Sequence, residues 1–182
     1  MKHESADVTI RPESPADHAQ IRRVVAEAFG SEVEADLVDR IRSSPEFVPE
    51  MALVAVTGGE VVGHVIVSGA TIRSDSGSRR ISMLSPLAVR PDRQRAGIGA
   101  RLVTSVLAVA DERNEPLVVL EGSPDYYGRF GFEHSVHHGI EIALPDWAPP
   151  EAAQVKRLRT FDPADPTLRG TVVYPPAFDA LE

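Results

Sequence analysis

The residues best placed to do chemistry lie in the segment 87–101, LAVRPDRQRAGIGAR. An apolar run is followed by a polar stretch, and Gly97 and Gly99 then open a helical pattern. The amides in the first turn of a helix have no partners within the helix, and the helix dipole favours negative charge there. A phosphate at this place could accept hydrogen bonds from those amides, and glycine lets the backbone approach it closely. The segment therefore predicts a loop that binds an anionic ligand.

A glycine-rich turn does not by itself identify its ligand. A Walker-type nucleotide loop would continue with Lys and Ser or Thr, whereas Gly99 is followed by Ala100 and Arg101. A dinucleotide fingerprint requires a third glycine where this chain has Leu102. Both patterns fit poorly. A helix start that uses its glycines only for tight packing is the alternative without a ligand.

The net charge of −8 over 182 residues argues against a nucleic-acid partner, because such proteins usually carry a basic excess or stripe. The arginines of the loop, Arg90, Arg93 and Arg95, instead indicate a local anionic ligand. The absence of cysteine excludes disulfides, thiolate metal sites and cysteine nucleophiles, and fits a reducing compartment. No signal-like or membrane-spanning apolar run is present, so we expect a cytoplasmic protein without a membrane partner.

Two segments together resemble the GNAT superfamily of N-acetyltransferases. Residues 94–99, QRAGIG, are similar to its Q/R-x-x-G-x-G/A motif, and LAV-x-P at 87–91 resembles the strand end before that motif. Residues 122–132, GSPDYYGRFGF, are similar to its tyrosine and Gly-Phe segment. The paired tyrosine and the tail 170–178, GTVVYPPAF, resemble a bacterial subgroup of predicted acetyltransferases.

The resemblance implies acetyl-coenzyme A (acetyl-CoA) as co-substrate and no metal. The loop amides would hold the pyrophosphate, and the preceding strand, splayed from its neighbour, would bind the pantetheine arm. The implied cofactor-binding residues are Leu87, Ala88, Val89, Gln94, Arg95, Ala96, Gly97, Ile98, Gly99 and Ala100. Pro86 agrees with an interrupted strand, since proline cannot donate to a sheet. The backbone of Leu87 or Ala88 could also polarise the thioester carbonyl.

The resemblance also implies direct acyl transfer to an amine, with a tyrosine four residues before the Gly-Phe pair as the acid. That tyrosine is Tyr127, and Tyr126 becomes a packing or substrate-facing neighbour. A phenol, with a reference pKa near ~10, can protonate a thiolate whose conjugate acid has a pKa near ~8.5. Glu121, at the end of the preceding strand, is a candidate general base. Other carboxylates that could border the acceptor are Glu32, Glu34 and Asp36.

Two further groups have an ordinary interpretation. His134, His137 and His138 lack a matching carboxylate pattern, so we expect no metal there. Trp147, set among prolines, is expected to cover an edge of the core or to border the substrate.

The elements that must position these residues follow from apolar periodicity. We expect strands near 8–11, 51–56, 61–72, 81–89, 117–120, 139–144, 154–160 and 171–174, with an exposed loop at 74–78. Helices are expected from Ser14 to about Gly30, around Leu37–Ile41, from Gly97 to Arg113, and briefly at 125–130. This order indicates an α+β (mixed α/β) domain. The resemblance implies a mostly antiparallel GNAT-type central sheet with a splayed strand pair, flanked by helices.

The predicted organisation is a single acetyltransferase domain over 1–182, with a core at 7–160 and a C-terminal extension at 161–182. The predicted function is transfer of an acetyl group from acetyl-CoA to a small-molecule amine. A non-catalytic CoA-binding regulatory or scaffold module is the alternative, and a dinucleotide-binding protein is disfavoured by Leu102. The acceptor is not identified, and a homodimer stays open.

Overall fold

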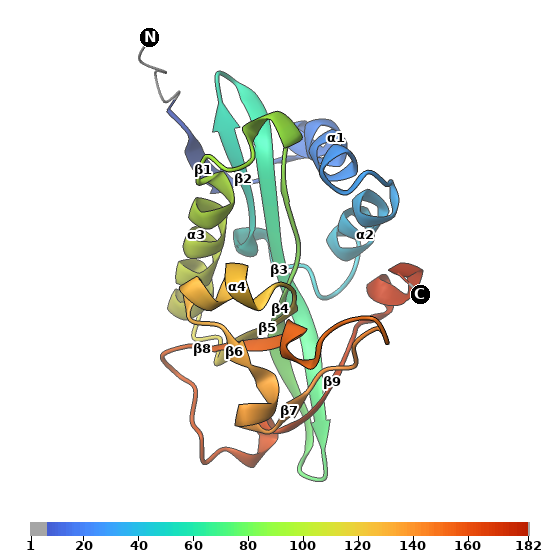
Figure 1. Cartoon of the computed structure of the whole chain (residues 1–182), viewed down its shortest axis with the longest axis vertical. Coiled ribbons are helices and arrows are strands. Elements are labelled where there is room, and N and C mark those ends of the chain that lie inside the picture. The colour runs from blue at the N-terminus through green and yellow to red at the C-terminus, as the bar shows by residue number, and fades with distance from the viewer. Residues whose placement is uncertain (1–6, 182) are drawn as a thin grey trace.

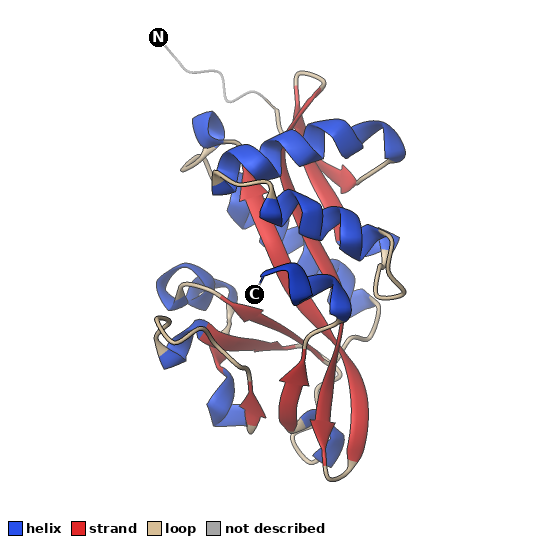
Figure 2. Ribbon diagram, turned by 90° about the vertical axis from the view of Figure 1, so that its right-hand side faces the viewer, coloured by secondary structure: helices blue, strands red, loops and turns tan. Residues whose placement is uncertain are grey.

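The computed structural model describes residues 7–181, and it is built around two long strands that run the length of the molecule (Figures 1 and 2). These are β3 (Glu60–Ser74) and β4 (Gly77–Val89), joined by a tight turn. The exposed loop predicted at 74–78 is therefore shorter than expected, because both strands continue into it. The remaining strands are β1 (Thr9–Pro12), β2 (Ala52–Thr57), β5 (Leu117–Glu121), β6 (Glu133–His134), β7 (Ile140–Glu141), β8 (Ala153–Arg157) and β9 (Gly170–Val173).

The sheet has the order β1-β2-β3-β4-β5-β8-β6, and most of its neighbours are antiparallel. The parallel pairs are β4 with β5 and β7 with β9. β9 pairs with the distal half of β3, where Thr71 faces Val173. The predicted α+β class and mostly antiparallel sheet are confirmed.

Helices cover both faces of this sheet (Figure 1). They are α1 (His18–Phe29), α2 (Val33–Arg42), α3 (Ile98–Glu112) and the short α4 (Pro124–Tyr127). α3 buries Leu102, Val103 and Val106 against one face, together with apolar residues of β2 to β5. α1 and α2 bury Ile21, Val25 and other apolar residues against the opposite face.

A further apolar cluster joins α2 to the C-terminal part of the chain. Leu168, Val172 and Phe178 are buried there with Leu37 and Ile41. The segment predicted as an extension, 161–182, thus contributes core residues. Strand predictions were weaker after Phe132: the strand expected at 139–144 covers only Ile140–Glu141.

Candidate active site

β4 and β5 run side by side over only a short stretch. Their parallel pairing covers Ser82 with Val118 and Met83 with Val119. β4 then continues to Val89 while bonded only to β3, so within residues 7–181 its other edge has no strand partner. Opposite Ile66, β4 carries an extra residue, since Val65 faces Leu87 but Val67 faces Leu84. The interruption predicted at Pro86 is confirmed, and it marks where the two strands diverge.

The loop between β4 and α3 has a backbone suited to an anion. Arg95 and Gly97 both adopt the left-handed region, with φ of 63° and 83°. The first intrahelical bond of α3 is donated by the amide of Arg101 to the carbonyl of Gly97 at 3.1 Å. The amides of Ile98, Gly99 and Ala100 precede it and have no partner within the helix. Successive amides around a left-handed residue form a concavity that attracts negative charge.

A cleft of about 500 Å³ lies over this loop and the end of β4. It is lined by Leu87, Val89, Arg93, Gln94, Arg95, Gly97, Ile98, Gly99, Ala100, Tyr126 and Arg129. The side-chain amide of Gln94 turns back and donates to the carbonyl of Val89 at 3.0 Å, which ties the loop to the strand. Ala96 is outside the lining, and Ala88 is buried against the α1–α2 face. The structure thus brings together most of the residues predicted for cofactor binding.

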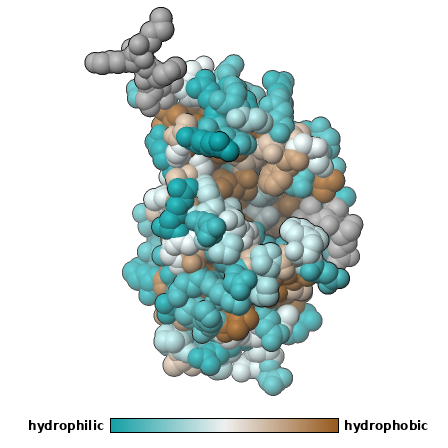
Figure 3. Space-filling view, in the orientation of Figure 1, coloured by the Kyte–Doolittle hydropathy of each residue, from teal (hydrophilic) through white to brown (hydrophobic). Residues whose placement is uncertain are grey.

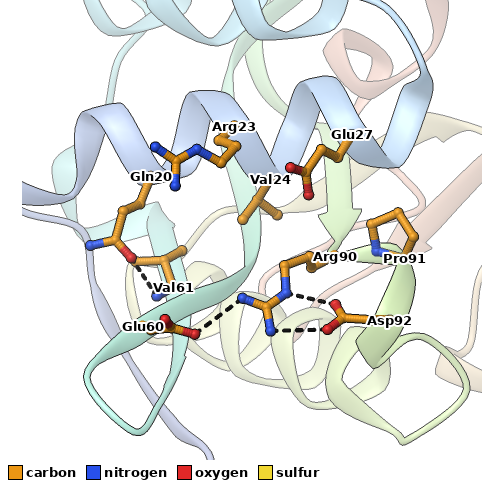
Figure 4. A pocket seen from close by; sticks show the side chains of 9 residues that line it. All are labelled: Gln20, Arg23, Val24, Glu27, Glu60, Val61, Arg90, Pro91 and Asp92. Atoms are coloured by element: carbon orange, nitrogen blue, oxygen red, sulfur yellow. Dashed lines mark hydrogen bonds and ion pairs between the residues drawn. The ribbon is translucent and has the colours of Figure 1, made fainter.

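Arg90 does not join the cationic group predicted for this loop. Its guanidinium bonds to the carboxylate of Asp92 at 2.6 and 3.1 Å and to Glu60 at 3.3 Å. It lies in a separate hollow of about 590 Å³ beside α1, where Gln20 accepts a hydrogen bond from the amide of Val61 (Figure 4). The prediction that Arg90 belongs to the cationic group of the loop was therefore wrong, because neighbouring carboxylates neutralise its charge.

Tyr126 faces the loop from the other side of the cleft. A Cβ placed on Gly99 would lie only 2.6 Å from its hydroxyl oxygen, so glycine leaves the room that this phenol occupies. The guanidinium of Arg129 stacks 4.4 Å from the centre of the Tyr126 ring, and its Nε donates to the Tyr126 carbonyl at 3.1 Å. Sequence reasoning missed Arg129. Its spacing of three residues from Tyr126 in a helical turn was the available signal.

Tyr127 is outside the lining of that cleft and packs at the end of β5. A Cβ on Gly122 would lie 2.6 Å from Cε2 of the Tyr127 ring, so the ring rests directly on the Gly122 backbone. Phe132 meets the ring edge-on at 5.8 Å between centroids. Burial raises the pKa of the Tyr127 phenol to about 12, so the group stays protonated through the neutral range.

Glu121, directly before Gly122, carries an unexpected partner. Its carboxylate accepts a hydrogen bond from the hydroxyl of Tyr174, a residue that follows β9. Burial and this carboxylate raise the pKa of Tyr174 well above the ordinary tyrosine value. The two residues are far apart in the sequence, so their pairing could not be read from local patterns.

Of the other carboxylates considered for the acceptor side, Glu32 and Asp36 are engaged on the surface, whereas Glu34 is half-buried and its Oε2 has no hydrogen-bond partner among residues 7–181. Arg22 bonds to Glu32 at 2.9 Å and to Asp36 at 2.7 Å, which ties α1 to α2. Trp147 is 85% exposed, so the expectation that it covers the core was wrong. It lies in a turn on the surface, which the amide of Ala148 closes by donating to the carbonyl of Pro145 at 2.9 Å.

The histidine group also has ordinary contacts. His138 lies 3.3 Å from the carboxylate of Glu133, and the rings of His134 and His137 are 5.3 Å apart. Across residues 7–181, no cluster of three or more His, Asp or Glu side chains has a metal-binding arrangement.

A comparison with protein-family models supports the same assignment as the splayed strands, the loop before α3 and the adjoining tyrosines. The model of the acetyltransferase (GNAT) domain matches residues 9–135. The chain belongs to the GNAT acetyltransferases. It is 33% identical to the N-acetyltransferase YhbS of Escherichia coli over 88% of this chain and 90% of that one. It is 35% identical to E. coli YjhQ, where the match covers 65% of each chain.

Solved structures of GNAT proteins share this fold along nearly the whole chain. E. coli YhbS in complex with CoA superposes with a TM-score of 0.82 at 30% identity, covering 98% of this chain and 96% of that one. A GNAT acetyltransferase from Brucella melitensis in complex with acetyl-CoA gives 0.76 at 31% identity, covering 96% and 99%. The chain is thus an acyltransferase of the GNAT type. None of its helices within residues 7–181 has the length and apolar character needed to cross a bilayer.

Proposed function

We propose that this GNAT protein transfers an acetyl group from acetyl-CoA to the amine of a small molecule by direct attack. The observation that carries the proposal is the juxtaposition of two features. A loop whose backbone amides suit an anion opens α3, and the buried phenol of Tyr127, whose pKa is raised, rests at the end of β5. The related YhbS and Brucella proteins, solved with CoA and acetyl-CoA, support the choice of cofactor.

The residues of the loop fit the cofactor's chemistry. Amides of Ile98 to Ala100 would hold the pyrophosphate, and Arg93 and Arg95 would add positive charge beside it. The unpaired edge of β4 at Leu87, Ala88 and Val89 would accept the peptide-like pantetheine arm, as an added strand would. The backbone at Leu87 or Ala88 is also our candidate for polarising the thioester carbonyl.

Three proton transfers accompany the reaction. When bound, acetyl-CoA supplies the acetyl thioester, whose C–S bond breaks as the C–N bond to the acceptor forms. We assign to the phenol of Tyr127 the proton that the departing sulfur receives. Glu121 takes a proton from the arriving ammonium, so that a neutral amine is available. The second proton lost by the nitrogen restores the phenol of Tyr127.

The test is thiol release from acetyl-CoA with a panel of primary amines, comparing Tyr127→Phe with Tyr126→Phe. Removing a positioned acid should lower kcat by roughly a hundredfold or more in Tyr127→Phe. CoA affinity, measured by calorimetry, should be unchanged in that variant. Tyr126→Phe serves as the matched control: it alters the cleft over Gly99 and should change CoA affinity more than kcat. Equal kcat in Tyr127→Phe and the parent would remove Tyr127 from the mechanism.

The same experiment addresses the non-catalytic alternative. A CoA-binding regulatory or scaffold module would bind CoA tightly, turn over no amine and be indifferent to Tyr127→Phe. Calorimetry with NAD in place of CoA separates the dinucleotide hypothesis, which Leu102 already disfavours.

A further inference from the structure

A third cavity, of about 600 Å³, lies at the C-terminal end of β5 and is bordered by the C-terminal segment of the chain. Glu121 of β5 lines one wall, Val172 of β9 and Tyr174 line another, and Phe178 lies in the final helical turn. Val172 and Phe178 are only 5% and 4% exposed, so this wall is anchored in the core. The cavity is therefore a built feature of the fold.

This cavity and the phenol of Tyr127 are reached from the same point of β5. Side chains alternate along a strand, so Glu121 shares the face of Leu117 and Val119, which pack toward α2 and the C-terminal segment. The next residue, Gly122, supports the ring of Tyr127. In Figure 3, drawn in the orientation of Figure 1, apolar surface is recessed near the middle of the face. A molecule in the cavity would thus approach the place where β4 and β5 diverge.

The charged side chains that line the cavity are all carboxylates. Glu121 and Asp179 are carboxylates, and the hydroxyl of Tyr174 is already donated to Glu121. The remaining lining is aliphatic, aromatic or proline, and it contains no Lys, Arg or His. Tyr174 bonds to one carboxylate oxygen of Glu121, Oε1, so Oε2 stays free to accept from a ligand. An ammonium group on an apolar body would match this arrangement in charge and in surface.

We propose that this cavity binds the acceptor, and that the acceptor is a primary amine, bound as its ammonium and attached to an apolar aliphatic or aromatic body. The proposal rests on the acetyltransferase function proposed above. Glu121 and Asp179 attract the cation, the apolar walls hold its body, and Tyr174 is a positioning residue that fixes the carboxylate of Glu121. An acceptor that carries its own carboxylate beside the amine meets like charge here and binds weakly.

Phenethylamine and phenylalanine provide a matched pair of probes. They share the ring and the amine, and only phenylalanine adds a carboxylate. Saturation-transfer NMR with the full chain and CoA measures binding without turnover, and thiol release gives KM for each amine. We expect phenethylamine to bind at least about tenfold more tightly than phenylalanine, the effect of a modest like-charge penalty. Glu121→Gln should reduce that preference.

Occupancy of the cavity is tested from its exposed rim. Ala143 lines the cavity at an exposed position, so Ala143→Trp should fill it with little effect on folding. We expect this variant to weaken phenethylamine binding by about tenfold or more while KM for acetyl-CoA stays constant. Ala164→Trp, at an exposed turn outside the cavity, is the matched control and should change neither.

Tyr174→Phe tests the positioning role. Loss of its hydroxyl should raise KM for phenethylamine and change the pH profile of kcat/KM. If Tyr174 had only a structural role, the pH profile would stay unchanged. Unchanged phenethylamine binding in Ala143→Trp, or equal binding of phenylalanine, overturns the proposal. If phenethylamine binds as expected in every variant but no amine is acetylated, the proposed function fails while the cavity assignment stands.

Discussion

At the scale of single residues, Gly122 links β5 to the candidate acid. Glu121, directly before it, lines the proposed acceptor cavity, and the ring of Tyr127 rests on the backbone of Gly122 itself. A side chain at this position would collide with the Tyr127 ring, at 2.6 Å from Cε2 and 2.9 Å from Cδ2. Glycine is therefore required here for space.

Gly122→Ala should displace the ring of Tyr127 and lower kcat by about tenfold or more, since a misplaced acid cannot reach the sulfur. The cleft over the α3 loop is untouched, so CoA affinity by calorimetry should stay constant. Overpacking should also lower the free energy of unfolding by about 1–3 kcal/mol.

Gly128→Ala is the matched control for this substitution. Gly128 has helical dihedrals, with φ of −56°, and a Cβ there meets no atom within 4 Å. Its kcat and stability should equal those of the parent or slightly exceed them. If both alanine variants retain full kcat, the ring of Tyr127 does not need its present place.

At the scale of elements, one carboxylate joins β1 to the start of α1. Asp17 is 6% exposed, and its carboxylate accepts hydrogen bonds from both terminal nitrogens of Arg11, at 2.7 and 2.9 Å. It also accepts from the amide of Ser14 at 2.8 Å, which completes a capping box. These contacts set the direction in which α1 leaves the sheet and crosses its face.

Asp17→Asn should lower the free energy of unfolding at neutral pH by about 1–2 kcal/mol, because the amide loses the charge-assisted bonds to Arg11. The bonds from Arg11 hold the pKa of Asp17 well below its ordinary value of 3.8. Because the pKa of Asp17 is lower in the folded state, the ionised carboxylate stabilises the fold fully above pH 3.8, the ordinary pKa of the group. This stabilisation is lost as the pH falls through the pKa of the folded state. The difference between parent and variant should therefore shrink in acid.

Urea unfolding followed by circular dichroism at neutral pH and at about pH 3, near the ordinary aspartate pKa, measures this difference. Asp75→Asn, in the exposed turn between β3 and β4, is the control and should be neutral at both values. A gap that widens in acid would contradict the assigned role of Asp17.

The elements that carry strong local signals could be predicted from the sequence. The α3 helix, expected from Gly97 to Arg113, forms at Ile98–Glu112, since its apolar face and glycine start are encoded within a few turns. The strand expected at 171–174 forms as β9 at Gly170–Val173, but its partner, β3, lies about a hundred positions earlier in the chain and could not be read from local patterns. The same reason hid the bond between Glu121 and Tyr174. The position of Trp147 was predicted wrongly because a bulky apolar side chain is usually buried, whereas here it lies on an exposed turn.

At the scale of the whole molecule, the C-terminal segment closes the core. Leu168 is 1% exposed and packs in one cluster with Leu37 of α2 and Leu117 of β5. Arg79 of β4 bonds to Asp165 and Thr167 at 3.0 Å each, which fastens the segment before Leu168. The tail therefore links α2, the sheet and the proposed acceptor cavity, so its order should decide both stability and the shape of that cavity.

Leu168→Ala should lower the free energy of unfolding of the full chain by about 2–5 kcal/mol, the cost of a cavity in a close-packed core. Leu158→Ala, at a half-buried position directly after β8, should cost less because water can fill the site. Unfolding is best followed by far-UV circular dichroism, since the lone tryptophan, Trp147, is 85% exposed and reports little on packing.

We expect a single unfolding transition for both variants, with the lower midpoint for Leu168→Ala. A midpoint equal to that of the parent would mean that residues 161–181 are an appendage whose packing the core does not need, and the acceptor cavity would lose its anchored wall.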